Sequence, residues 1–424
     1  MLINKLKQLL SGQFIRNVGW LGGAELVSRV FRLGTIIILA RVFSSSDYGL
    51  AAIVYATYEF ASVFTLKYGI GAKIIQADEK DVKTICDTSY WLNWMLCISI
   101  FIIQCIASFP IAQFYGNNQL ILPICTASLT YLMLPVFMVQ SAMIQRENRL
   151  KITALCNATQ SILSSIITVI IALLGMGVWA IVWSLILTTP VWIIITYMNH
   201  PWRPPQSFRL ERWREVTHFG KNMLGVDLLS KLRINIDYLL IGRFLGVEAL
   251  GIYYFAYNAG MGISLNIMNS FFSALFPHLC ASRDDFKQFK KRYFSGLKML
   301  AIIFVPLVLL QSSLAPLYVP IVFGEKWTSS IPVLIIICLS VLPTAFWWAF
   351  SMFLDAMDKT HITFFLDLIF TVMFILAILI SVNWGILGVA VGVLVSHLLV
   401  IPCFIPVLQK YLNKGGITAM SSNL

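Results

Sequence analysis

The stretch Gly22 to Gly49, GGAELVSRVFRLGTIIILARVFSSSDYG, places charged residues inside an apolar run long enough to cross a membrane. Glu25, Arg29 and Arg32 are spaced at i, i+4 and i+7, so on a helix they share one face. An ionised side chain in hydrocarbon costs about 3 kcal/mol on insertion scales. Such residues are retained where they face a polar interior or a partner. This stretch therefore predicts a helical membrane protein with a charged interior.

The same pattern returns in the second half of the chain. Glu25 corresponds to Asp227 and Arg29 to Lys231, with no gap between the two pairs. Later matches keep the order and nearly the same spacing: FYGNN at 114–118 with VFGEK at 322–326, and Leu134-Pro135 with Leu342-Pro343. Single matches are weak in apolar sequence, but their common order predicts an internal duplication.

Composition places the whole chain in a membrane. Of 424 residues, 58% are hydrophobic and only 12% are charged, and the mean hydropathy is +0.81. A soluble domain is about 25% charged, so a soluble protein is excluded. The net charge of +12 is spread over short loops, which argues against a nucleic-acid partner. The eight cysteines contain no C-x-x-C pair, so neither a metal site nor a disulfide framework is predicted.

We predict an all-α integral membrane protein with twelve spans. The first six are 18–40, 48–68, 88–110, 119–141, 152–174 and 177–198, and the second six are 218–242, 250–274, 297–319, 329–353, 361–382 and 385–408. Because each half has an even number of spans, both halves start on the same side of the membrane. The repeat is therefore parallel, about an axis along the membrane normal.

The distribution of basic residues predicts the orientation. Most of the 31 lysines and arginines fall at the termini and in alternate loops, while the opposite loops hold only Arg41, Arg243 and Lys326. By the positive-inside rule both termini are cytoplasmic. The predicted organisation is an interfacial helix (1–17), an N-terminal six-helix bundle (18–198), a cytoplasmic connector (199–217), a C-terminal six-helix bundle (218–408) and a cytoplasmic tail (409–424).

No enzyme motif accompanies these spans. The sequence has no G-x-x-x-x-G-K-[ST] loop, no H-E-x-x-H and no Ser-His-Asp arrangement, and the outer loops are too short for a catalytic domain. We predict that the protein is not an enzyme and uses no cofactor or metal. His397 lies within the last span; a packed or hydrogen-bonded histidine is favoured there over a proton carrier.

The intramembrane cations are the candidate substrate site. At about 1.5 Å per residue, Arg29, Arg32, Lys231 and Arg233 lie roughly 15–22 Å from the cytoplasmic edge. A water-filled cavity with this cationic floor suits a phosphate-bearing substrate, because guanidinium groups bind phosphate oxygens in bidentate fashion. Arg32 has no acidic partner on its own helix.

A structural interpretation competes with this one. Three i,i+4 pairs, Glu25–Arg29, Asp227–Lys231 and Arg233–Asp237, can neutralise each other and join helices. Glu59 and Asp367 are further intramembrane carboxylates. The aromatic clusters of the second and eighth spans can stack on sugar rings, although packing is the commoner reason for such clusters.

Four segments resemble a known family: ARVFSSSDYGLAAI at 40–53, SAMIQRENRLKI at 141–152, IGRFLGVEALGIYYFAYNAG at 241–260 and VFGEKW at 322–327. They are similar to the polysaccharide repeat-unit flippases, of the O-antigen, capsule and colanic-acid type, within the multidrug/oligosaccharidyl-lipid/polysaccharide exporter superfamily. The likeness covers essentially the whole chain. One departure is KYGIGAKIIQ at 67–76, where Lys67 stands close to a position at which the family leads us to expect an acidic residue.

The resemblance implies a V-shaped pair of six-helix bundles working by alternating access. Its substrate would be an undecaprenyl-diphosphate-linked oligosaccharide, moved to the outer leaflet of the bacterial inner membrane for surface polysaccharide synthesis. Membrane lipids, a polymerase and a chain-length regulator are the implied partners. Arg29, Arg32 and Lys231 match the family's cationic cavity. Drive by an ion or proton gradient would use intramembrane carboxylates, for which the candidates are Glu25, Glu59, Asp227, Asp237 and Asp367.

Three other functions compete. A multidrug or small-cation antiporter of the same superfamily should have an acidic cavity, whereas the charges here are mainly cationic. A membrane polymerase or ligase should have a sizeable outer domain, which the sequence lacks. A scaffold of the glycan assembly machinery has little reason to keep four cations near mid-bilayer.

Overall fold

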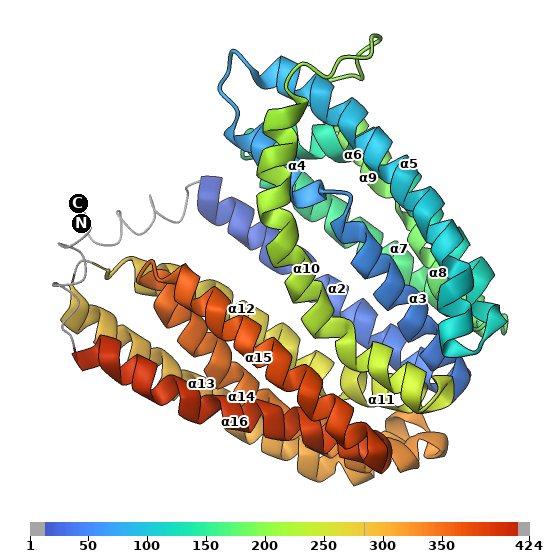
Figure 1. The fold of residues 1–424 in the computed structure, drawn as a ribbon, viewed down its shortest axis with the longest axis vertical. Helices are drawn as coiled ribbons and strands as arrows, with labels where there is room; N and C mark the ends of the chain where they lie inside the picture. Colours follow the sequence, from blue (N-terminus) through green and yellow to red (C-terminus); the bar gives the residue numbers. More distant parts are fainter. Residues whose placement is uncertain (1–12, 284, 414–424) are drawn as a thin grey trace. The chain divides into compact units, whose positions relative to one another are not determined.

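The computed structural model describes residues 13–283 and 285–413, in which every regular element is a helix (Figure 1). The chain forms two compact units, one ending at Asn235 and the other starting at Ile236. This boundary lies inside α10 (Trp213–Phe244), so one helix belongs to both units. The interfacial helix expected at 1–17 and the tail at 409–424 lie largely outside the described residues.

From residue 13 on, where the structure describes it, the N-terminal unit contains eight α-helices and a short 3-10 helix before α10. They are α2 (Gln13–Val42), α3 (Ser45–Val63), α4 (Lys67–Gln76), α5 (Val82–Tyr115), η1 (Asn118–Leu120), α6 (Ile121–Arg146), α7 (Leu150–Leu173), α8 (Trp179–Thr188) and α9 (Pro190–Asn199). Within this unit, α5 packs along α6, and α2 packs along α7.

Two predicted spans are each divided into two helices. The second span consists of α3 and α4, and the sixth consists of α8 and α9.

The C-terminal unit repeats this plan. After α10 come α11 (Val247–Ala259), α12 (Met261–Cys280), α13 (Phe286–Tyr318), the π-helix η2 (Val319–Phe323), η3 (Glu325–Ser330), α14 (Ile331–Ala356), α15 (Thr360–Ser381), η4 (Val382–Trp384) and α16 (Gly385–Asn413). Helices α13 to α16 lie alongside one another (Figure 1).

The structural parallels agree with the duplication inferred from the sequence. Helices α6 and α14 each have 26 residues, each follows a 3-10 helix, and each contains the matching proline, Pro135 or Pro343. The predicted eighth span divides at Gly260 into α11 and α12, as the second divides between α3 and α4.

Eight stretches within the described chain are long and apolar enough to cross a membrane. The last of them, Thr360–Leu412, is 53 residues long and contains both α15 and α16. Helices α2 and α10, which carry the cations predicted to be intramembrane, are not among the eight. The protein is thus an all-helical, multi-pass membrane protein, and the count of twelve spans stays a prediction.

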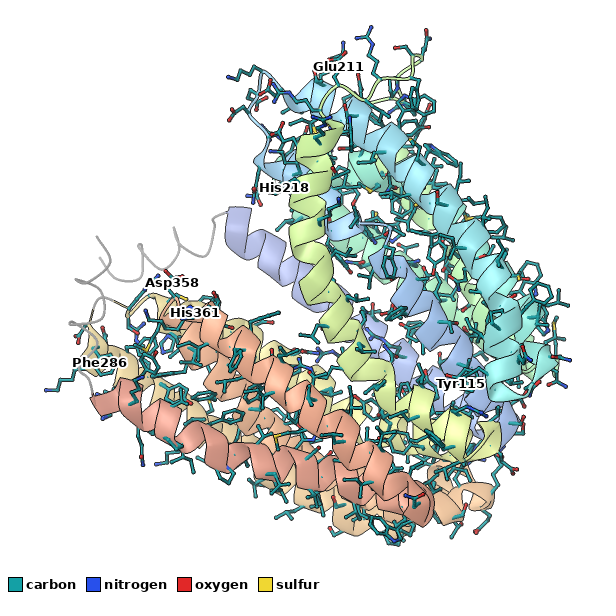
Figure 2. All side chains as sticks on the ribbon, in the orientation of Figure 1. Tyr115, Glu211, His218, Phe286, Asp358 and His361 are labelled. Carbon is teal, nitrogen blue, oxygen red and sulfur yellow. The ribbon has the colours of Figure 1, made fainter. Side chains whose placement is uncertain are left out.

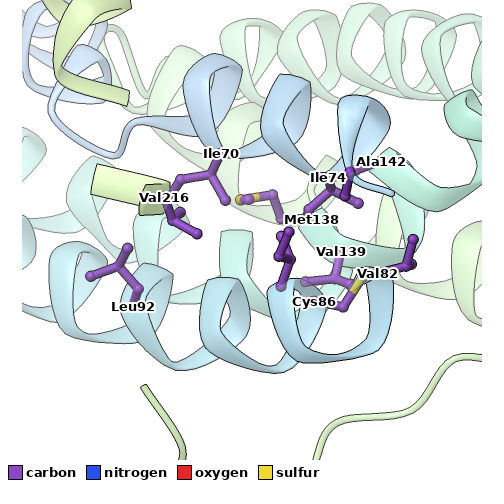
Figure 3. Packing of buried hydrophobic residues seen from close by; sticks show 11 residues of the cluster. Ile70, Ile74, Val82, Cys86, Leu92, Met138, Val139, Ala142 and Val216 are labelled. Carbon is purple, nitrogen blue, oxygen red and sulfur yellow. The ribbon is translucent and has the colours of Figure 1, made fainter. Parts of the chain in front are cut away.

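A buried apolar cluster joins α4, α5 and α6 to the beginning of α10 (Figure 3). Ile70 and Ile74 of α4 meet Cys86 of α5 and Val139 of α6, and Val216 of α10 is fully enclosed with them. The first turns of α10 are therefore part of the N-terminal core.

Hydrogen bonds and ion pairs hold the connector against α4 and the loop that follows it. Arg212 donates to both carboxylate oxygens of Asp81, at 2.9 and 3.0 Å. Lys73 of α4 lies 2.6 Å from the carboxylate of Glu215, and its hydrogen bond holds the pKa of Glu215 below the ordinary value. Figure 2 shows Glu211 and Tyr115 at opposite ends of the N-terminal unit, so this attachment occupies the connector end only. The sequence did not predict it.

Two glycines let α4 and α10 touch through their backbones. A Cβ atom built on Gly69 would stand 2.6 Å from the Cα of Gly220, closer than real atoms approach. Gly71, two residues further on the same helix, has nothing within 4 Å of its built Cβ. The contact therefore requires glycine at 69 and not at 71.

We predict that Gly69→Ala destabilises the protein and that Gly71→Ala does not. Forcing a methyl group against backbone costs about 1–3 kcal/mol, so the melting temperature in detergent should fall by several degrees. Gly71→Ala should leave it unchanged or raise it, because alanine is the better helix former by about 1 kcal/mol. Equal melting temperatures for the two variants would contradict the backbone contact.

Candidate functional site

The break between α3 and α4 places charged residues in the interior of the N-terminal unit. Leu66 has a left-handed backbone with φ of 52°, which is strained for a side chain of this kind and ends the run of helix. The buried carbonyl of Thr65, next to this break, accepts a hydrogen bond from the buried side-chain amide of Asn93, at 3.0 Å. Because this carbonyl has a partner, the break is tolerated away from water. Glu59 precedes the break and Lys67 follows it.

Glu59 is the centre of the charged group. Its carboxylate accepts a hydrogen bond and forms an ion pair with Lys231 of α10, and both side chains are about a quarter to a third exposed, 22% and 32%. Lys67 also interacts electrostatically with Glu59. Two ammonium groups thus share one carboxylate, and Asp227, one turn before Lys231, interacts with Lys231 as well.

Both lysines lie far along their helices from the connector end. Helix α4 runs ten residues from Lys67 to Gln76, or about 15 Å, before it reaches the connector end. Lys231 lies on α10 about 24 Å beyond Glu215. Of the two side chains, Lys67 is exposed and Lys231 is half-buried.

Aromatic side chains surround these charges. Tyr58 and Tyr131 stack at 5.2 Å with nearly parallel rings, and the Tyr131 hydroxyl donates to the carbonyl of Tyr58 at 2.7 Å. The Lys67 ammonium lies 5.9 Å from the ring centres of both Tyr68 and Trp192. A cation over aromatic faces is stabilised by about 0.5–2 kcal/mol. The group combines positive charge with flat apolar surfaces.

The predicted arginines lie on two helices of this unit. Arg29 is half-buried on α2 and Arg32 is exposed on the same helix, while Arg233 is half-buried on α10. Arg32, for which its own helix offered no acidic partner, is nevertheless engaged in the structure, as are Arg29 and Arg233. The side chain of Glu25 lies outside the described part, so its pairing with Arg29 stays a prediction.

The pairing of Lys231 differs from the sequence expectation. The i,i+4 rule nominated Asp227, but the ion pair that forms is with Glu59, far away in the sequence and on another helix. The i,i+4 rule considers one helix at a time, so it cannot identify a carboxylate on another helix as the partner. Glu59 and Lys231, two of the predicted site residues, are thus brought together.

Two further carboxylates predicted from the sequence, Asp237 and Asp367, belong to the C-terminal unit. Asp237 is buried at 4% exposure and accepts hydrogen bonds from the Tyr253 hydroxyl and the Tyr238 amide, both at 2.9 Å. The rings of Tyr254 and Tyr257 pack edge-on against Tyr238 and complete a tyrosine cluster. Asp367 is half-buried on α15.

His397 is held by packing and hydrogen bonding. Its Nδ1 donates to the carbonyl of Val393 at 2.7 Å, and its ring packs edge-on against Phe370 and Phe374. This is the environment favoured from the sequence. Across the residues that the structure describes, no three histidine, cysteine, aspartate or glutamate side chains are placed to hold a metal ion.

Lys67 is the residue that sequence reasoning missed. It was treated as a departure from an expected pattern, whereas the structure puts it beside Glu59 and Trp192. One signal could have found it: a lysine directly after an apolar run and beside a tyrosine, at the depth of the other cations. The break at Leu66, which determines where Lys67 points, leaves no signature in the sequence.

The chain matches the family model described as "Polysaccharide biosynthesis protein" over residues 38–332, which is most of its length. Similar proteins include the lipopolysaccharide biosynthesis protein WzxC of Escherichia coli K12, 26% identical over 91% of this chain and 78% of that protein. The teichuronic acid biosynthesis protein TuaB of Bacillus subtilis 168 is 26% identical over 77% of this chain and 67% of its own.

A solved structure shares the fold. The lipid II flippase MurJ, in an inward closed conformation, superimposes with a TM-score of 0.75 over 94% of this chain and 90% of its own. The two sequences are only 13% identical, so this likeness concerns the fold alone.

We predict that Glu59 and Lys231 are energetically coupled. Removing either partner leaves a partly buried charge or donor without its bond, at a cost of about 1–3 kcal/mol. Glu59→Gln and Lys231→Gln should each lower thermal stability, and the double variant should lose less than the sum, with a coupling of about 1 kcal/mol.

A matched pair on the same helix provides the control for this cycle. Lys221 is exposed and lies earlier on α10, so Lys221→Gln should add independently to Glu59→Gln. Strictly additive losses for Glu59 and Lys231 would mean that the pair contributes nothing to stability.

Proposed function

Because the chain belongs to the polysaccharide biosynthesis protein family, we propose that it flips lipid-linked oligosaccharide repeat units across the bacterial cytoplasmic membrane. The related proteins WzxC and TuaB are named for the synthesis of lipopolysaccharide and teichuronic acid, which are both surface polysaccharides. MurJ, a lipid II flippase, has the same fold as this chain, which is a further support for the proposal. The observation that carries the proposal is the charged and aromatic group around Glu59, Lys67 and Lys231 in the N-terminal unit.

The chemistry of the substrate accounts for this site. An undecaprenyl diphosphate carries negative charge that must cross hydrocarbon, and cationic residues at mid-depth compensate it. Arg29, Arg32, Lys231 and Arg233 are the proposed diphosphate ligands, with the arginines supplying bidentate contacts. The glycan occupies a polar interior while the lipid tail stays in the bilayer. No covalent bond changes, so the protein acts as a transporter and not as an enzyme.

Alternating access then moves the headgroup between leaflets. In this proposal twelve membrane spans form two bundles of six, both termini are cytoplasmic, and the bundles rock about the substrate. A polymerase and a chain-length regulator receive the product on the outer side.

Ion or proton coupling resets the carrier. When the substrate's phosphate takes Lys231, the Glu59 carboxylate loses its partner, and a proton or a metal cation is the ligand that can replace it. Glu25, Asp227, Asp237 and Asp367 are further coupling candidates. A multidrug or small-cation antiporter would share the fold, but the excess of cations over carboxylates at this site favours an anionic substrate.

We predict that Arg32→Ala slows leaflet transfer at least tenfold. Losing one charge-assisted hydrogen bond to phosphate costs about 1.5–3 kcal/mol, and 1.4 kcal/mol corresponds to a factor of ten. The measurement is transfer of an undecaprenyl-diphosphate oligosaccharide in proteoliposomes, compared with Arg209→Ala, which removes an arginine from the exposed connector.

The possible results distinguish the proposed flippase function from the proposed role of Arg32. Transfer by the intact protein that survives Arg32→Ala would retain the flippase and remove Arg32 from the site. Absence of transfer by the intact protein, with the native glycan supplied, would overturn the proposed function.

Topology has its own test. In a variant without native cysteines, Asn117→Cys between α5 and η1 should react with a membrane-impermeant maleimide in intact cells, and Arg209→Cys only after permeabilisation. The reverse pattern would invert the proposed orientation, and labelling of both sites in intact cells would contradict the assignment of these ends to opposite sides.

A further inference from the structure

We propose that the beginning of α13, residues 286–298, binds the headgroups of anionic phospholipids through a row of four exposed lysines: Lys287, Lys290, Lys291 and Lys298. This surface goes beyond the proposed function, because it holds lipid of the surrounding bilayer whether or not a glycan is transferred. It is carried by the place of the four side chains on the helix, by their exposure, and by the contrast with α5 in the N-terminal unit.

The lysine row occupies one face of α13. At about 100° per residue its four side chains fall within roughly 100° of arc. The inward face of the same turns is buried, and the rings of Phe289 and Tyr293 lie 5.4 and 4.8 Å from the ring of Phe353. Because α13 is packed along this inward face, the lysine row is directed away from the C-terminal unit.

The lysine row ends where an uncharged stretch of the helix begins. Residues 299–318 carry no charge, and at 1.5 Å per residue they measure about 30 Å, the thickness of the hydrocarbon core. The outward face continues through them with Ile302 and Leu309, which are 62% and 52% exposed. Lys298 therefore lies at the edge of the core, and the other lysines lie toward the water. Helical side chains lean toward the N-terminus of their helix, so the ammonium of Lys298 extends toward the headgroups.

Positive charge is in excess at this end of the C-terminal unit. Residues 283–298 contain six basic residues and only two acidic ones. Asp285 accepts hydrogen bonds from backbone amides at the start of α13, and Asp358, which lies at the same end as Phe286 (Figure 2), pairs with Arg283 at 3.4 Å. Residues 1–12 and 414–424 contain no aspartate or glutamate, so they cannot supply an anion. A ligand from outside the chain can compensate the lysines.

Helix α5, the counterpart of α13 in the internal repeat, is covered at its beginning by the protein itself. The ring of Tyr90 lies 5.8 Å from the ring of Trp202 in the connector, and the indole of Trp91 donates to the carbonyl of Ser207 at 3.0 Å. The offset between the repeats is 208 residues in this region, so Lys298 corresponds to Tyr90. One unit thus covers this helix with connector residues, and the other presents lysines there.

An anionic phospholipid matches the lysine row in charge and in polarity. Each lysine near an anionic membrane surface contributes about fivefold to binding. The row continues directly into an exposed apolar face, and Phe294, 44% exposed, lies among the lysines. An acidic protein would match the charge alone, whereas a phospholipid has a negative headgroup for the lysines and acyl chains for the apolar face below them.

Quenching by brominated lipids tests this surface in the full-length protein. In a variant without native cysteines, reconstituted in liposomes, a fluorophore on Ser295→Cys reports on the lysine row. A fluorophore on Ser313→Cys reports on an exposed position near the other end of the same helix. We expect brominated phosphatidylglycerol to bind beside residue 295 at least fivefold more strongly than brominated phosphatidylcholine. Beside residue 313 the two lipids should bind equally.

Charge substitutions show whether the lysine row causes the preference. Replacing its four lysines with glutamine should reduce the binding ratio at residue 295 to about one, and replacing them with arginine should keep it. Salt at 1 M should lower the ratio in the unsubstituted protein, because it screens exposed charges. The matched control removes the same charge from four exposed lysines of the N-terminal unit and should keep the ratio: Lys80, Lys83, Lys151 and Lys221, each to glutamine.

Three results would overturn the phospholipid site. Equal binding of the two phospholipids beside residue 295 would leave an acidic protein as the candidate occupant. A preference that survives the glutamine substitutions would remove the lysines from its cause. Displacement of brominated phosphatidylglycerol by undecaprenyl diphosphate at a much lower mole fraction would assign the row to that lipid instead. The arginine variant and the label at residue 313 guard against a folding defect.

Discussion

The energy of placing charge in hydrocarbon governs the rest of this structure. An ionised group inside the membrane persists only with a partner, and the ion pair between Glu59 and Lys231 supplies one across two helices. The pair is incompletely buried, which leaves both groups within reach of a ligand. Such an arrangement stabilises charged groups in a polar interior, and under the proposed function an anionic substrate competes for the lysine.

Local breaks in helices make that interior possible. A continuous second span would have carried Lys67 elsewhere on its surface, but the left-handed Leu66 restarts the helix in a new direction, with Asn93 satisfying the carbonyl of Thr65. The cost of the break is offset by one buried hydrogen bond, and the gain is a lysine beside Glu59 and Trp192. Backbone irregularity in membrane proteins is tolerated where it lines protein or a cavity, which is the case here.

Sequence reasoning reached the fold because its signals are local. Apolar length, charge spacing and the repeat of α6 in α14 are all visible along the chain, and so were the charges Arg29, Lys231 and Glu59 as candidates. What failed was pairing between helices. Nothing in the sequence distinguishes Asp227 from Glu59 as the partner of Lys231, and nothing in it marks the bonds of Arg212 with Asp81. These depend on which helix surfaces meet, a property of packing that a one-dimensional pattern does not contain.

The attachment of the connector also bears on how the polypeptide must be made. Arg212, Glu215 and Val216 bind α4, α5 and the loop between them without help from the peptide bonds ahead of them. A chain severed near Ser207 would leave these contacts whole, since the cut separates Asp81 and Lys73 from their partners only covalently. Two polypeptides, 1–207 and 208–424, therefore retain the means to find each other when synthesised apart. The connector is thus held to the N-terminal unit by noncovalent contacts in addition to the continuous chain.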